Sequence, residues 1–105
     1  MKDQEYYERV EVLFNQVEDT IDELEFDLDI DTSGGILNIT MPDGSSIILS
    51  RQIANHEIWI AAKSGGYHLG FDGQQWQCAT STEDILTLLS RVFKEQLGIE
   101  VSLLL

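Results

Sequence analysis

The sequence has one cysteine, one proline and few basic residues, and these shortages exclude several classes of protein. Cys78 alone cannot form an internal disulfide or a thiolate metal centre, so we expect a reduced, packed thiol. No apolar run reaches the roughly 18 residues that span a bilayer, and the first residues lack a signal-peptide pattern. We therefore expect a cytoplasmic protein. The net charge of −13 disfavours binding to nucleic acids and anionic membranes.

What the chain does contain is enough apolar sequence for one hydrophobic core. It has 105 residues, 43% of them hydrophobic, and no low-complexity stretch. A chain of this length is too short for two domains that each bury their own core. We therefore predict a single domain over residues 1–105.

Two segments show the apolar spacing of amphipathic helices. The first begins at Tyr6 and repeats its apolar residues three and four positions apart as far as Leu24. The second runs from Ile85 to Leu97 and ends at Gly98, a favourable C-terminal cap. The residues Thr80 to Glu83 before it resemble a capping box, which predicts the start of this helix.

Between the helices lie short alternating segments separated by turn residues, which predict antiparallel strands. The predicted strands cover residues 26–31, 36–41, 47–49, 57–62, 67–71 and 74–78. The turns between them are predicted at Gly34-Gly35, Pro42 to Gly44, Gly65-Gly66 and Asp72-Gly73. The expected fold is α+β, a two-layer sandwich with two helices packed on one face of an antiparallel sheet of about six strands.

The negative charge is concentrated at the start of the chain. Residues 1–31 contain 12 Asp or Glu against Lys2 and Arg9, and no Lys or Arg occurs between residues 10 and 50. Like charges four residues apart destabilise a helix by roughly 0.2 to 0.5 kcal/mol per pair. Acids near a helix C-terminus also oppose the macrodipole, at about 0.3 to 1 kcal/mol each. An acidic surface with this uncompensated repulsion is a candidate binding site.

Clustered carboxylates favour hard cations such as calcium, magnesium, manganese and iron. Their spacing on a helix and a strand does not match an EF-hand loop, and no catalytic motif is present, so we expect a protein that is not an enzyme. His56 and His68 are more typical of structural residues than of ligands. Alternation turns Trp59 toward the outer face of the sheet, where it is a candidate contact residue, whereas Trp76 is expected to pack.

Three stretches in the middle of the chain form a specific signature: Ser50 to Gln52, His56 to Ala61 and Ser64 to His68. This signature resembles that of the frataxin family, above all its bacterial CyaY-type branch. The acidic first helix and strand, the Gly34-Gly35 turn, Trp76 and the closing helix extend the similarity over nearly the whole chain. Departures at Ile53-Ala54 and Leu69 affect the expected loop shape.

The resemblance implies an iron-binding regulator of iron–sulfur cluster assembly that docks on a cysteine desulfurase and its scaffold protein. It implies a weak site for ferrous or ferric iron, which other divalent cations can also occupy, at eight carboxylates that we call the acidic ridge: Glu18, Asp19, Asp22, Glu23, Glu25, Asp27, Asp29 and Asp31. The expected partner contacts are Glu11, Glu18, Asp19, Asp22, Glu23 and Trp59.

Two alternatives use the same surface: a chaperone that donates iron to the scaffold, and a ferroxidase that stores iron by oligomerising. Without iron we expect a monomer. The family resemblance also implies that the C-terminal tail, which ends in Leu103-Leu104-Leu105, covers the core between the helices.

Overall fold

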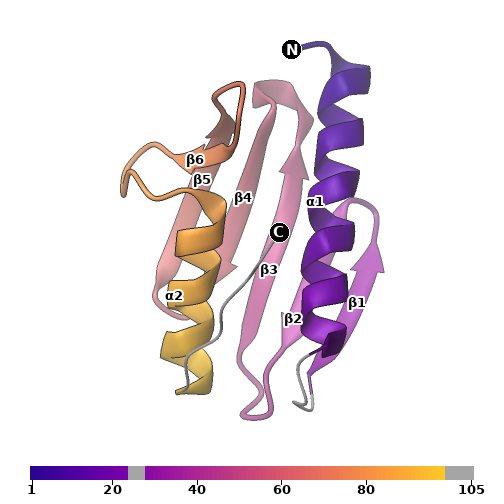
Figure 1. Ribbon diagram of the computed structural model, residues 1–105. Helices are drawn as coiled ribbons and strands as arrows, with labels where there is room; N and C mark the ends of the chain where they lie inside the picture. The colour runs from indigo at the N-terminus through magenta and orange to yellow at the C-terminus, as the bar shows by residue number, and fades with distance from the viewer. Residues whose placement is uncertain (24–27, 99–105) are drawn as a thin grey trace.

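The computed structural model describes residues 1–23 and 28–98, which form two layers (Figure 1). In chain order the elements are α1 (Asp3–Glu23), β1 (Asp29–Ser33), β2 (Ile36–Thr40), β3 (Ser46–Gln52), the 3₁₀ turn η1 (Ile53–Asn55), β4 (Glu57–Ala62), β5 (Gly65–Phe71), β6 (Trp76–Cys78) and α2 (Ile85–Leu97). The predicted α+β sandwich is confirmed. Among the described residues, no helix is long and apolar enough to cross a membrane.

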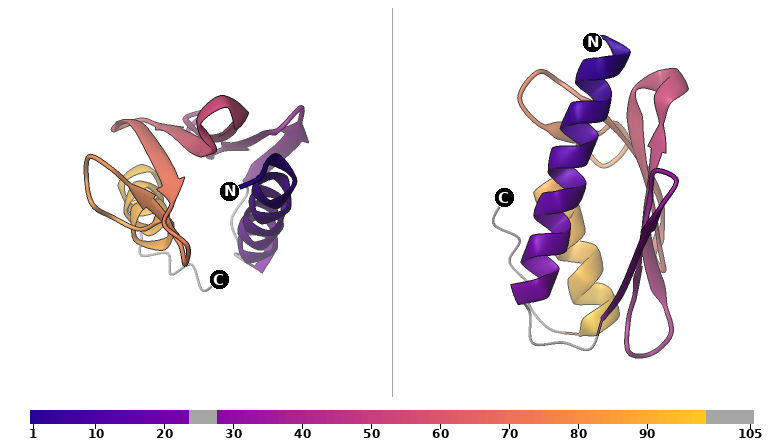
Figure 2. Two further views of the ribbon diagram at one scale, coloured as in Figure 1. Left: turned by 90° about the horizontal axis from the view of Figure 1, so that it is seen from above. Right: turned by 90° about the vertical axis from the view of Figure 1, so that its right-hand side faces the viewer.

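The six strands form one antiparallel meander in the order β1-β2-β3-β4-β5-β6. Each strand pairs with its neighbour in sequence, so short turns suffice and no crossover is needed. Figure 2 shows both helices on the same side of this curved sheet, which leaves its other side free of helices. We call the two sides the inner face and the outer face.

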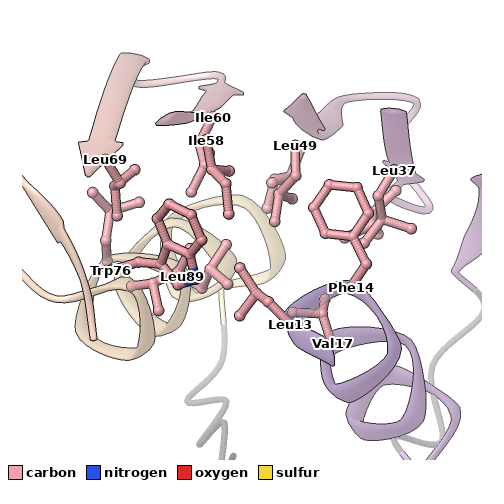
Figure 3. Close-up of a cluster of buried hydrophobic side chains, with 14 of the residues drawn as sticks. Leu13, Phe14, Val17, Leu37, Leu49, Ile58, Ile60, Leu69, Trp76 and Leu89 are labelled. Atoms are coloured by element: carbon pink, nitrogen blue, oxygen red, sulfur yellow. The ribbon is translucent and has the colours of Figure 1, made fainter. Parts of the chain in front are cut away.

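The core lies between the helices and the inner face, as Figure 3 shows. Alternation places Leu37, Leu49 and Ile60 inward on successive strands, and each is 1% exposed or less. From α1, Leu13, Phe14 and Val17 point toward them, and Leu89 of α2 and Trp76 of β6 complete the cluster. Trp76, which is 4% exposed, packs as predicted.

One buried tyrosine connects α1 to the centre of the sheet. The Tyr6 hydroxyl donates to the carbonyl oxygen of Glu57 at 2.6 Å and accepts from the Gln52 N–H at 2.9 Å. Gln52 is the last residue of β3 and Glu57 is the first residue of β4, and η1 lies between the two strands. Burial raises the pKa of Tyr6, although the hydrogen bond from Gln52 opposes this shift, so the hydroxyl stays protonated and can donate at neutral pH.

The start of α2 differs from the prediction. The N-cap is Asp84, whose carboxylate accepts from the Thr87 N–H at 2.8 Å, so the capping box predicted at Thr80 to Glu83 is wrong. The backbone of that segment instead forms a turn closed by a bond from the Thr82 N–H to the Cys78 carbonyl at 3.0 Å. Gly98 ends the helix with φ +76°, as predicted.

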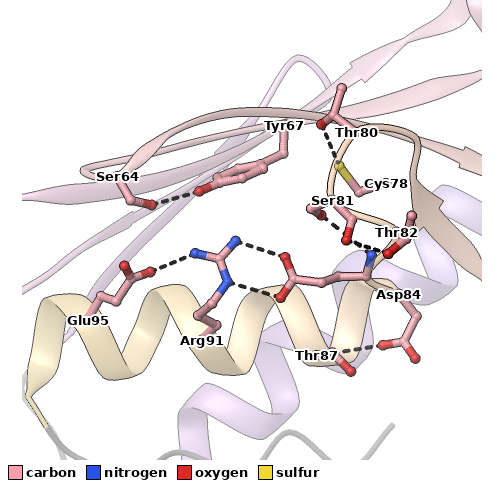
Figure 4. A network of polar contacts seen from close by, with 11 residues as sticks. Ser64, Tyr67, Cys78, Thr80, Ser81, Thr82, Asp84, Thr87, Arg91 and Glu95 are labelled. Atoms are coloured by element: carbon pink, nitrogen blue, oxygen red, sulfur yellow. Dashed lines mark hydrogen bonds and ion pairs between the residues drawn. The ribbon is translucent and has the colours of Figure 1, made fainter.

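A polar network holds this turn, α2 and β5 together (Figure 4). The Arg91 guanidinium donates to both carboxylate oxygens of Glu83, at 3.0 and 2.9 Å, and to Glu95 at 3.0 Å. It also lies over the ring of Tyr67, 5.3 Å from the centroid. Arg91 therefore joins α2 to the preceding turn through Glu83 and to β5 through Tyr67, whereas its contact with Glu95 lies within the helix.

Several predicted boundaries also shift. Gly34 and Gly35, with φ +60° and +80°, form the predicted turn, but the β4–β5 turn is Lys63-Ser64, because Ala62 pairs with Gly65. The predicted Gly65-Gly66 turn is therefore wrong: glycines can join a strand when the pairing register requires it.

Strand lengths also differ from those predicted, most of all at β3 and β6. The strand predicted at 47–49 extends over Ser46–Gln52, because polar residues on the outer face do not interrupt pairing. The β5–β6 turn covers residues 72–75, so β6 begins at Trp76. The tail predicted to cover the core lies outside the described residues.

Candidate metal and partner surface

The ridge acids of α1 lie along the half of the helix that ends at Glu23. Asp19, Asp22 and Glu23 are exposed, as is Glu11 two turns earlier, whereas Glu18 is partly buried. The last turn of α1 contains no basic residue. The partial negative charge of the helix C-terminus therefore adds to these carboxylates rather than being offset by a cation.

β1 contributes the second row of carboxylates. Asp29 and Asp31 are exposed, and Ile30 between them packs against the core. The alternation predicted for this strand is therefore confirmed where the structure describes it. Glu25 and Asp27, the other two predicted ridge acids, lie outside the described residues.

A hydrogen bond joins the two rows. Thr32 Oγ1 of β1 donates to Glu18 Oε1 of α1 at 2.7 Å. Figure 1 shows β1 running back alongside α1, so the two elements that carry the ridge acids are neighbours. Six of the eight acids of the ridge are thus described, on two neighbouring elements that this hydrogen bond joins.

The three arginines, all of them described, are engaged elsewhere. Arg9 pairs with Glu5 at 3.1 Å and covers Phe71, and Arg91 pairs with Glu83 and Glu95. Arg51 lies 4.7 Å over the ring of Tyr7. The ridge therefore keeps the repulsion that the sequence predicts.

Within residues 1–23 and 28–98, no three His, Cys, Asp or Glu side chains converge on a point where they could hold a metal ion. The described ridge acids other than the partly buried Glu18 are instead exposed on a helix and a strand. Oxygen ligands in this arrangement suit hard cations that exchange readily and keep part of their water shell. Such a surface also attracts a basic protein by long-range electrostatics.

The two histidines and the cysteine lie away from the ridge. His56 Nε2 contacts Asp3 Oδ1 at 2.8 Å, and its ring stacks on Tyr6. Cys78 is 1% exposed. Burial opposes ionisation of its thiol, but hydrogen bonds from Ser81 and Thr80 outweigh burial and lower its pKa to about 7.

Trp59 lies on the outer face, partly exposed, as predicted. Its ring stacks on His68 with centroids 4.3 Å apart and planes 8° apart, and its Nε1–H donates to Glu57 Oε1 at 3.1 Å. Sequence reasoning missed both partners. Predicting the β4–β5 turn at Lys63-Ser64 would have identified His68 as a partner, because that pairing register places His68 opposite Trp59.

Comparison with known proteins agrees with this architecture. The sequence model of the frataxin-like domain matches residues 1–99. A curated relative from Stutzerimonas stutzeri (strain A1501), named iron-sulfur cluster assembly protein CyaY, is 42% identical over 95 residues, which cover 89% of this chain and 86% of the relative. The chain therefore belongs to the frataxin family, in its bacterial CyaY-type branch.

Solved structures place the fold in the same family. Frataxin from Psychromonas ingrahamii, studied for stability modulation within the CyaY family, superposes with a TM-score of 0.92 and 27% identity, and the match covers 100% of both chains. Yeast frataxin superposes with a TM-score of 0.76 over 90% of this chain and 82% of that one. At 18% identity, the yeast protein supports the fold alone.

Proposed function

We propose that this protein regulates iron–sulfur cluster assembly by binding iron loosely on the acidic ridge and docking on a cysteine desulfurase and its scaffold protein. The relative from Stutzerimonas stutzeri, which is named for cluster assembly, supports the general role. The observation that carries the finer proposal is the double row of exposed acids on α1 and β1, joined by Glu18 and Thr32. The proposal assigns no catalysis to the chain.

The proposed mechanism is electrostatic. A basic patch on the desulfurase approaches Glu11, Glu18, Asp19, Asp22 and Glu23 of α1, while Trp59 extends the contact onto the outer face. Bound Fe²⁺ or Fe³⁺ neutralises part of the ridge and so changes its attraction for that patch. Iron occupancy thereby adjusts complex formation, and complex formation weakens as salt concentration rises.

An iron titration tests the metal site. Fe²⁺ is added without oxygen to ¹⁵N-labelled protein, and the loss of NMR signal by paramagnetic broadening is recorded for each residue. We expect loss confined to residues 11–31. Broadening centred on His56 or His68 would overturn the assignment, because neither lies on the ridge.

A charge reversal tests the partner site. The triple variant Asp19→Lys, Asp22→Lys and Glu23→Lys is expected to lose desulfurase binding in a pull-down at low salt. The matched control, Glu5→Lys with Glu8→Lys and Glu95→Lys, makes the same change in net charge away from the ridge and should retain binding. Equal binding by the two triple variants would contradict the proposal.

Two further measurements separate the regulator from the alternatives that share its ridge. A ferroxidase consumes oxygen when it is mixed with Fe²⁺ and assembles into oligomers visible by light scattering. An iron donor is needed only for the supply of metal, so it leaves sulfide production by the iron-free desulfurase unchanged. A regulator alters that sulfide production without consuming oxygen.

A further inference from the structure

The indole of Trp59 stacks on His68 with one face, and the strand neighbour on its other side, Ser50, is small. In the pairing register, the outer-face row across the sheet is Ile36, Ser50, Trp59 and His68. The His68 ring stacks on one side of the indole, 4.3 Å away. The neighbour on the opposite side, Ser50, has only a hydroxymethyl group to set against the large ring. Among the described residues, only His68 places a ring or guanidinium against this indole.

This row leaves a slot above Ser50. Neighbouring strands are about 4.8 Å apart, so Ile36 on β2 and Trp59 on β4 stand about 9.6 Å apart across β3. A flat group packed between two surfaces needs roughly 3.5 to 4 Å on each side. The spacing therefore accommodates one planar group between the indole and Ile36, whose side chain is 45% exposed.

The charges around the slot are negative. Glu57 accepts the Trp59 Nε1–H with Oε1 at 3.1 Å, which leaves its second carboxylate oxygen able to accept another donor. On the outer face, the described strands hold Asp29, Asp31 and Glu57 but no Lys or Arg. Arg51 is on β3 but faces inward, where it covers Tyr7 of α1. An occupant of the slot therefore meets an electron-rich ring and a carboxylate.

We infer that this slot receives an arginine side chain of the docked partner. The guanidinium is planar, stacks on an indole and donates through a rigid fork, so it can lie on Trp59 and bond Glu57 at once. The ammonium of lysine is compact and strongly hydrated, and it makes poorer use of the slot. His68 is then a positioning residue that holds the indole upright. This inference rests on the proposed function, because it names the group that the partner presents.

A small-molecule titration tests the chemistry without the partner. N-acetyl-arginine amide, N-acetyl-lysine amide and N-acetyl-phenylalanine amide are added in turn to ¹⁵N-labelled protein, and the two indole N–H signals are followed. We expect the Trp59 signal to shift most with the arginine probe, while buried Trp76 serves as an internal reference. Equal shifts with the arginine and lysine probes, or the largest shift with the phenylalanine probe, would overturn the assignment.

A slot-filling variant tests the site in the complex. Ser50→Ile fills the space beside the indole with a residue that suits a strand, and Ser46→Ile makes the same change on the same strand and face, four residues away. Binding to the desulfurase and scaffold is expected to weaken at least about fivefold for Ser50→Ile and to be unchanged for Ser46→Ile. Glu57→Gln, which keeps an acceptor for the indole but removes the charge, should weaken binding to an intermediate degree.

The outcomes separate the two proposals. If the wild-type chain does not bind the desulfurase complex, the proposed function fails, whatever the small probes show. If the wild-type chain and Ser50→Ile bind equally tightly and melt at the same temperature, docking stands and the arginine slot is wrong. Melting temperatures also show whether weaker binding by Ser50→Ile reflects a filled slot or a damaged fold.

Discussion

Thr32 donates a hydrogen bond to Glu18 across 2.7 Å, and this contact joins the strand and helix rows of the acidic ridge. One of the Glu18 oxygens is therefore already engaged by the protein. Asp19, Asp22 and Glu23, by contrast, are exposed on α1. Within the described ridge, Glu18 is best suited to hold the two rows in place, and the exposed acids are best suited to meet cations.

The substitution Thr32→Val tests this structural role. It removes the donor to Glu18 but keeps a β-branched residue suited to β1. The free energy of unfolding should fall by about 0.5 to 1 kcal/mol, the usual contribution of one hydrogen bond. Urea denaturation measures the change, and Thr40→Val on β2 is the control. Equal losses in both variants would show that the hydroxyl of Thr32 has no special role.

Reversing the ridge charge should stabilise the fold. In the variant with Asp19, Asp22 and Glu23 all replaced by lysine, the free energy of unfolding should rise by about 1 to 3 kcal/mol at low salt. The reason is that lysine near the C-terminus of α1 complements the macrodipole and ends the repulsion.

Two features make this prediction specific. The gain should shrink in concentrated salt, since screening weakens all these terms. The same acid-to-lysine change at the other end of the helix, Asp3→Lys with Glu5→Lys, should instead lower stability, because acids in the first turn favourably oppose the helix dipole. A gain in both variants would point to net charge rather than position.

Removing the buried hydroxyl of Tyr6 should be costly. The Tyr6 side chain is 0% exposed. Tyr6→Phe therefore removes the hydroxyl that the Gln52 N–H and the Glu57 carbonyl bond inside the protein. Buried polar groups left unpaired cost about 1 to 3 kcal/mol each, so we expect a loss of about 2 to 4 kcal/mol in chemical denaturation. Tyr7→Phe, at a ring that is 40% exposed, should change stability little.

The Glu83–Arg91 pair predicts a specific acid dependence. The hydrogen bonds from Arg91 hold the pKa of Glu83 below its ordinary value of 4.5, against the opposing effect of burial. The stabilisation is therefore complete above pH 4.5 and is lost as pH falls through the lowered folded-state pKa. Glu83→Gln should lose about 1 kcal/mol at neutral pH and show a weaker acid dependence below pH 4.5.

Glu95→Gln provides the control for this prediction. Glu95 contacts the same guanidinium at 3.0 Å, but its side chain is 45% exposed, compared with 19% for Glu83. The Glu95 variant should change stability less than the Glu83 variant. Thermal melts across the acid range compare them, and identical pH profiles for wild type and Glu83→Gln would refute the assignment.

The architecture was predictable because each element has its own local pattern. Tyr6, Val10 and Val17 recur at helical spacing, and all three are buried in α1. Asp29, Ile30 and Asp31 alternate as a half-buried strand does. Among the ridge acids that the structure describes, this periodicity alone placed the side chains on α1 and β1.

What sequence reasoning missed depends on register and on long-range contacts. Thr80 to Glu83 has the composition of a capping box, yet Asp84 caps the helix, because backbone bonds to Cys78 close the earlier residues into a turn. The stack of Trp59 on His68 depends on a turn placed two residues earlier than predicted. Composition does not show which of several neighbouring polar residues caps a helix. It also does not fix the pairing register of two strands.

The position of β1 has a consequence for self-association. β1 is an outermost strand of the sheet, and within the part of the chain that the structure describes one of its edges pairs with no strand. Exposed edges invite pairing with other chains, and proteins commonly discourage this with charged side chains. The negative charges of Asp29 and Asp31 therefore discourage another chain from pairing with that edge. If the proposed cation binding involves these two aspartates, the bound charge weakens this protection, and metal loading then favours edge-to-edge assembly.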